Sequence, residues 1–95
     1  MATKVLDSWA LIAFFEGEPA APKIKEILLR ADAGRDHLLL SVVNWGEIYY
    51  NTMRETSREA ADQIVREIAG MAIELVPVDT DLQLVRQAAI YKAGG

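Results

Sequence analysis

The chain has 95 residues, 52% of them apolar, and a formal net charge of −4 at pH 7. These values fit one small globular domain and exclude a disordered chain, while the absence of cysteine excludes disulfides and thiolate metal sites. A chain without a broad basic face must meet any nucleic acid through a local patch, a metal ion or a partner chain.

The first predicted elements are a short strand and two helices. Residues 3–7 (TKVLD) are mostly apolar up to an aspartate, which predicts a short buried strand. Residues 8–18 then have helical character, with Ser8 as the expected N-cap and Gly17 as the stop. A second helix is expected from the prolines that follow until Gly34.

The middle of the chain repeats this order. Residues 37–41 (HLLLS) predict a second strand, and residues 42–56 turn helical at once. Another helix is expected from about Ser57, its predicted N-cap, to Gly70. Each of the first two strands is therefore followed by two helices.

The last predicted elements are a third strand at 73–78 and a final helix at 79–93. Pro77 indicates that the strand ends there or lies at an edge of the sheet, and Asp79 or Thr80 is the expected helix cap. The order β-α-α-β-α-α-β-α predicts an α/β fold with a parallel sheet, because parallel strands need crossover connections. Functional sites in such sheets form outside the carboxyl ends of the strands.

Two carboxylates are the candidate site residues. Asp7 ends the first strand and Glu47 lies in the first turns of the helix after the second strand, so neighbouring strands would bring them to one edge. Carboxylates without Cys or His suit a hard divalent cation, Mg²⁺ or Mn²⁺, which can activate water and polarise a phosphate oxygen. A simpler reading stays open, with Asp7 as a helix N-cap and Glu47 as a solvated residue favoured by the helix dipole.

Other residues near these two acids have mainly structural interpretations. Asn44 lies one helical turn before Glu47 and is expected to share its face. Four aromatic residues fall at helical spacings and are interpreted as core or dimer contacts rather than as base-stacking surfaces: Trp9, Trp45, Tyr49 and Tyr50.

Three stretches carry a resemblance to a known family. VLDSWALIAFFEGEPAA resembles the opening of the PIN-domain family, in particular of the VapC-type toxins, where an aspartate ends the first strand. LLLSVVNWGEIYYNTMR resembles the second family motif, whose glutamate corresponds to Glu47. IELVPVDTDLQLVRQAAIYKA resembles the third strand and the helix after it. The resemblance runs through the whole chain in order.

This resemblance implies a three-layer αβα domain around a central parallel sheet and a metal-dependent endoribonuclease. Asp7 and Glu47 would bind Mg²⁺ or Mn²⁺, and an activated water would hydrolyse an RNA phosphodiester bond. The resemblance also implies an antitoxin protein as partner and a homodimer. We expect a cytoplasmic protein, because no apolar run approaches the ~20 residues that span a bilayer.

The third acidic motif of the family is expected after residues 79–93, and the chain stops before it at Gly95. We therefore expect residues 1–95 to be a single, C-terminally truncated PIN-like domain that lacks the last strands and exposes a sheet edge beside the first strand. A domain-swapped or paired dimer is one way to restore the missing part. The alternative function is a catalytically inactive remnant that dimerises or binds an antitoxin.

Overall fold

A parallel β-sheet organises the fold, which we describe from a computed structural model that defines residues 2–77 and 89–91. The strands lie in the order β3-β2-β1-β4 and pair in parallel throughout. Within the described residues, the strands are Ala2–Leu6 (β1), Asp36–Ser41 (β2), Ile73–Val76 (β3) and Ala89–Tyr91 (β4). The predicted α/β class, with a parallel sheet flanked by helices, is confirmed.

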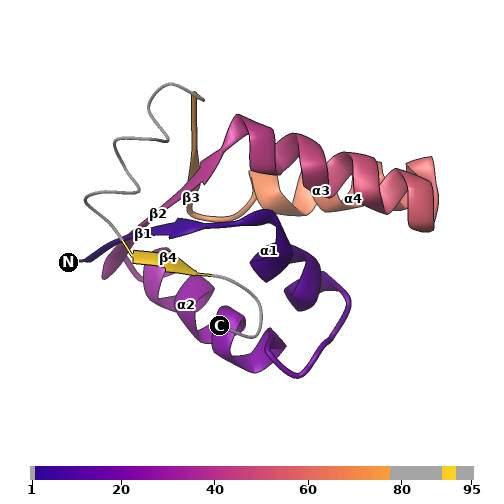
Figure 1. Cartoon of the computed structure of the whole chain (residues 1–95). Helices are drawn as coiled ribbons and strands as arrows, with labels where there is room; N and C mark the ends of the chain where they lie inside the picture. The colour runs from indigo at the N-terminus through magenta and orange to yellow at the C-terminus, as the bar shows by residue number, and fades with distance from the viewer. Residues whose placement is uncertain (1, 78–88, 92–95) are drawn as a thin grey trace.

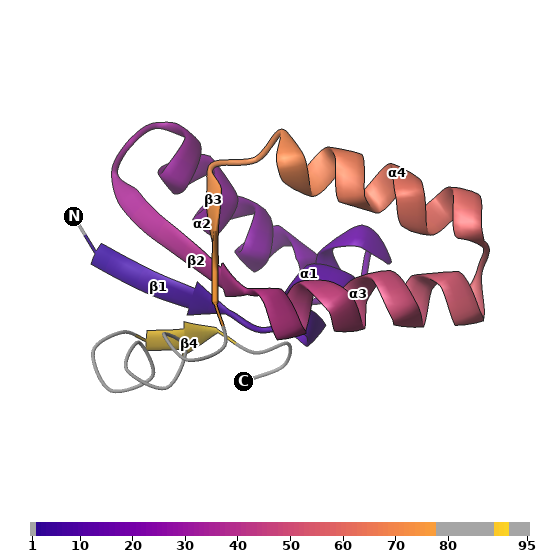
Figure 2. The ribbon, with the colours of Figure 1, turned by 90° about the horizontal axis from the view of Figure 1, so that it is seen from above.

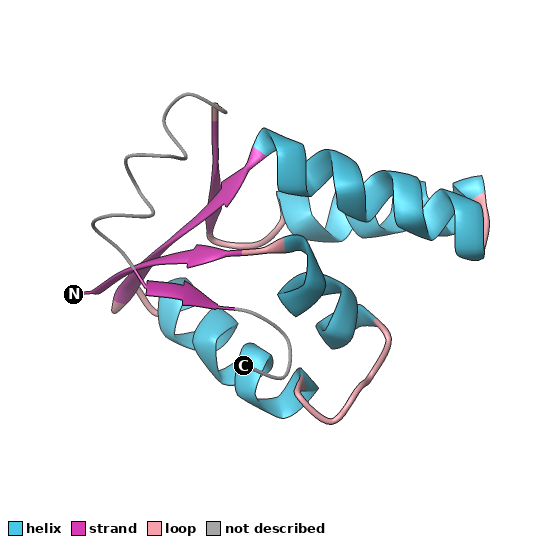
Figure 3. Ribbon diagram, in the orientation of Figure 1, coloured by secondary structure: helices cyan, strands magenta, loops and turns pink. Residues whose placement is uncertain are grey.

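The helices in the described part of the chain begin and end within a few residues of the predicted bounds. Helices α1 (Ser8–Phe15) and α3 (Val42–Glu55) leave the same edge of the sheet, directly after β1 and β2 (Figure 3). Helix α2 (Ala21–Asp32) packs against α1, while α3 and α4 (Arg58–Ala69) run side by side away from the sheet (Figures 1 and 2). None of the described helices has the length and apolar character of a membrane span.

Short-range signals set the ends of these elements. Gly17 after α1 and Gly34 after α2 have positive φ angles of 67° and 76°, a conformation that glycine adopts without strain. Ser57 caps α4 as predicted, because its hydroxyl accepts a hydrogen bond from the N–H of Ala60 at 3.0 Å. Strand β3 lies at an edge of the sheet and ends directly before Pro77, as the proline predicts.

The main core lies on the face of the sheet against which the helices pack. Leu6, Leu38 and Leu40 are fully buried there and contact apolar residues from all four described helices, Ile48 of α3 among them. Burial of each such side chain contributes roughly 1.5–3 kcal/mol. Because side chains alternate along a strand, the opposite face carries its own smaller cluster. That cluster consists of Val5, Leu39 and Val76.

A buried ion cluster joins β1, α2 and β2 at the edge where β2 begins. The side chain of Asp36 is 1% exposed; its Oδ2 accepts from Arg30 Nε at 2.7 Å and from Lys4 Nζ at 3.0 Å. Its Oδ1 accepts from the backbone N–H of Ala2 at 3.3 Å. These hydrogen bonds, that from Arg30 foremost, hold the pKa of Asp36 well below its usual range. No sequence pattern predicts this role of Asp36, because its partners come from other elements of the fold.

The predicted helix at 79–93 is wrong for the part that the structure describes. Ala89–Tyr91 form β4, which pairs in parallel with β1 and covers the edge that we expected to be exposed. Ile90 is β-branched and favours a strand, and β1 offers backbone groups that an added strand can pair. The rest of the predicted helix, with its expected cap at Asp79 or Thr80, lies outside the described residues.

Candidate functional site

Asp7 follows the last residue of β1 and is the N-cap of α1. Its backbone is extended, and its Oδ1 accepts a hydrogen bond from the N–H of Ala10 at 2.9 Å. The chain stays extended up to residue 7, so Ser8, the predicted cap, is instead the first helical residue. Ser8 is buried. The N-cap interpretation of Asp7 is therefore confirmed. In the described part of the chain no hydrogen bond reaches its Oδ2, which leaves that oxygen for a ligand.

Ser41 holds the equivalent position at the end of β2. Its hydroxyl accepts a hydrogen bond from the N–H of Asn44 at 3.1 Å and caps α3. Leu6 pairs with Leu40, so Asp7 and Ser41 follow at neighbouring strand ends, about 4.8 Å apart across the sheet. Two helix N-termini thus meet at one edge, and their partial positive charge favours carboxylates and phosphates.

Glu47 lies on α3 beyond this edge. It is six residues after Ser41, about 9 Å further along the helix axis, and its side chain is exposed. Asn44 is half-buried and lies between them on the same face of the helix as Glu47. The structure therefore places Asp7 at the sheet edge and Glu47 on the helix that starts beside it. Their joint binding of one ion stays a prediction.

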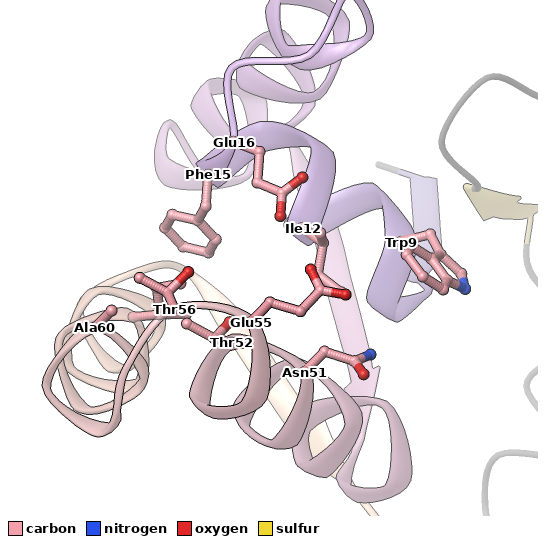
Figure 4. A pocket seen from close by; sticks show the side chains of 10 residues that line it. Trp9, Ile12, Phe15, Glu16, Asn51, Thr52, Glu55, Thr56 and Ala60 are labelled. Atoms are coloured by element: carbon pink, nitrogen blue, oxygen red, sulfur yellow. The ribbon is translucent and has the colours of Figure 1, made fainter.

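A pocket of about 190 Å³ lies between α1 and the α3–α4 pair (Figure 4). Helix α1 contributes Trp9, Ile12 and Phe15, and α3 contributes Asn51 and Glu55. The described lining combines apolar side chains with amide, hydroxyl and carboxylate groups, and it contains neither lysine nor arginine. No sequence pattern predicts this pocket, because its walls come from helices that are far apart in the chain.

The aromatic residues near the site have different environments. Trp9 is 58% exposed and Tyr50 is 56% exposed, so neither is a core residue, and the predicted dimer contact stays a prediction for both. Trp45 is half-buried and stacks on Tyr49, with ring centroids 6.2 Å apart. The Tyr49 hydroxyl donates to Asp62 at 3.0 Å and joins α3 to α4.

A comparison with known families identifies the domain that carries this site. The PIN domain matches residues 4–94, which is nearly the full chain. The chain belongs to the PIN-domain family. A search of curated proteins found no significant match. Membership of the family indicates a nuclease, and PIN domains generally use divalent metals.

The donors in this PIN domain suit a hard divalent cation. Asp7 offers Oδ2 and Glu47 an exposed carboxylate, and Mg²⁺ typically binds through one or two carboxylates while it keeps several waters. Within residues 2–77 and 89–91, no three or more His, Cys, Asp or Glu side chains come together as a metal-binding group. The predicted donor set among the described residues is therefore limited to these two acids, and water and substrate oxygens would have to complete the coordination.

Proposed function

We propose that this PIN domain is a Mg²⁺- or Mn²⁺-dependent endoribonuclease that hydrolyses RNA phosphodiester bonds as the toxin of a toxin–antitoxin pair. One observation carries the proposal: Asp7 stands at the edge where the N-termini of α1 and α3 meet, and Glu47 lies on α3 beyond it. The family match supports the nuclease part, and the resemblance to VapC-type toxins supports the choice of RNA and of an antitoxin partner.

The residues of the chain have separable roles in this reaction. Asp7 would hold the cation through Oδ2, while the hydrogen bond from Ala10 to Oδ1 fixes the orientation of the carboxylate. Glu47 would supply the second carboxylate. A bound divalent cation supplies the polarisation of a phosphate oxygen and the activation of water. The two helix N-termini favour the negative charge of the scissile phosphate at the same edge.

Partner binding follows from charge and from the family resemblance. The chain has a net charge of −4. An antitoxin segment with lysine or arginine side chains would be complementary to this negative charge. We propose a homodimer as the assembled form, on the basis of the resemblance alone.

Cleavage of a labelled RNA pool tests the proposed function. The wild type should cleave RNA in the presence of Mn²⁺ or Mg²⁺ and not in the presence of EDTA. The cleavage rate of Glu47→Gln should fall about 100-fold or more, because loss of a ligand carboxylate removes several kcal/mol of charge stabilisation. Glu26→Gln on α2 is the matched control and should cut like the wild type. Equal cleavage rates for Glu47→Gln and Glu26→Gln would show that Glu47 has no role in the reaction.

A second candidate function is a binding domain without activity. One observation favours it: in the described residues no third acidic side chain joins Asp7 and Glu47. Fewer charged ligands hold a divalent cation less firmly. Calorimetry with Mn²⁺ separates the two functions, since heat that Glu47→Gln abolishes supports the nuclease and an absence of heat supports the binding domain.

A further inference from the structure

An exposed tryptophan lies beside the candidate site. Trp9 is 58% exposed and stands in the first turn of α1, two residues after Asp7. Single exposed apolar side chains are common on protein surfaces, so exposure alone assigns no role. The additional observation is that Trp9 forms one end of the pocket between α1 and α3, together with Asn51 (Figure 4).

The composition of this pocket suits a flat aromatic group with hydrogen-bonding edges. Ile12 and Phe15 supply apolar surface, and the indole of Trp9 supplies a flat aromatic face. The described lining holds no cationic side chain and carries the carboxylates of Glu16 and Glu55, so it disfavours a phosphate inside the pocket. Trp9 follows Asp7 by two residues, so a phosphate bound at Asp7 would lie near the Trp9 end of the pocket.

Neighbouring contacts orient the two polar groups on α3. Arg54 Nη2 donates to Asn51 Oδ1 at 3.3 Å, which leaves the amide N–H groups of Asn51 as donors. The Glu55 carboxylate reaches across the pocket towards Ile12 (Figure 4) and is an acceptor. Asn51 therefore presents donor groups on the α3 wall and Glu55 presents an acceptor. The Watson–Crick edge of a nucleobase has the complementary pair, and only an unpaired nucleotide exposes that edge.

We propose that Trp9 stacks on an unpaired base of the nucleotide next to the scissile phosphate, and that Asn51 and Glu55 hydrogen-bond to the edge of this base. The proposal rests on the proposed ribonuclease function and assigns a base-binding subsite to it. Trp9 is a positioning residue, because it holds the substrate and does not touch the reacting atoms. The pocket excludes phosphate from its interior, so the RNA backbone runs along its rim.

Tryptophan fluorescence tests the stacking directly. The chain contains two tryptophans, so Trp45→Phe leaves Trp9 as the single reporter. In EDTA, a ten-nucleotide unstructured RNA should quench the emission of this variant, whereas the same RNA annealed to its complement should not. The converse variant, Trp9→Phe, retains Trp45 and should show no quenching by either RNA.

Binding of a fluorescein-labelled copy of the same RNA, followed by anisotropy, supplies the second measurement. Trp9→Ala should weaken binding about 5- to 150-fold, the range for loss of one base–aromatic stack, and Trp9→Phe should restore most of it. Leu29→Ala on α2 removes an apolar side chain that is also 58% exposed, and it should bind like the wild type.

Two results would overturn the proposal, and they differ from failure of the proposed function. If RNA binds but the Trp9 emission does not change, or if Trp9→Ala binds like the wild type, the base does not enter the pocket. A protein segment would then be the better candidate to bind in the pocket. If the wild type neither binds nor cleaves RNA, the ribonuclease function fails and the base site fails with it.

Discussion

The two roles of Asp7 can be separated by substitutions that keep one role and remove the other. Its Oδ1 caps α1 through the N–H of Ala10 at 2.9 Å, and its Oδ2 is the proposed metal ligand. Asparagine and serine are also good N-caps, but neither carries a negative charge. Asp7→Asn should therefore preserve the helix and lose the metal, whereas Asp7→Ala should lose both.

The expected magnitudes follow from this geometry. Loss of the cap in Asp7→Ala costs about 1 kcal/mol, which corresponds to a fall of about 4 to 8 °C in Tm for a domain of this size. Asp7→Asn should melt within about 1 to 2 °C of the wild type, because its amide oxygen still accepts the Ala10 hydrogen bond. Its rate of RNA cleavage should nevertheless fall about 100-fold or more, since a ligand charge is lost.

Differential scanning calorimetry, Mn²⁺ titration and RNA cleavage measure these effects on the same protein preparations. Ser57→Ala is the matched control, because it removes the N-cap of α4 and leaves the candidate site intact. It should lose stability like Asp7→Ala and retain cleavage per folded molecule. Cleavage by Asp7→Asn at the wild-type rate would refute the metal role of Asp7, and an unchanged Tm in Asp7→Ala would refute its role as a cap.

Three further predictions concern stability. Asp36→Asn should lower the Tm at pH 7, because it removes the negative charge that pairs with Arg30 and Lys4. A Tm equal to that of the wild type would contradict this prediction. The pKa of Asp36 is lower in the folded chain than in the unfolded one, so its stabilisation is complete above about pH 4 and is lost as the pH falls further; Asp36→Asn should flatten the acid limb of the pH–Tm curve. Leu40→Ala should lower the free energy of unfolding by about 2 to 5 kcal/mol, because Leu40 is fully buried between the sheet and the helices. Urea denaturation measures this loss. A loss below about 1 kcal/mol would mean that the neighbouring core side chains close around the smaller alanine.

Local patterns predicted the helices well. Gly17 and Gly34 follow helix ends, Ser57 caps α4, and Pro77 follows β3, each for a reason that involves only a few neighbouring residues. Of the two caps that the sequence offered for α1, Ser8 was wrong and Asp7 was right, because both residue types cap helices and only the backbone conformation selects between them.

Local patterns gave the wrong secondary structure for the segment Ala89–Tyr91. Its surroundings in the sequence have helical spacing, and the structure pairs it with β1 instead. The strand is formed because β1 presents a row of backbone donors and acceptors, and pairing them outweighs a weak local helix preference. No pattern within the segment itself reports that such an edge lies nearby.

The order of most elements and the position of Asp7 at the end of a strand follow from local sequence patterns, because periodicity, caps and turns act over a few residues. Which distant residues meet depends on the packing of the whole fold. Asp36 forms ion pairs with Arg30 and Lys4, which belong to other elements. Trp9 of α1 and Asn51 of α3 line the same pocket. Such contacts depend on how strands and helices pack in space, and therefore the ion cluster and the pocket became visible only in the folded chain.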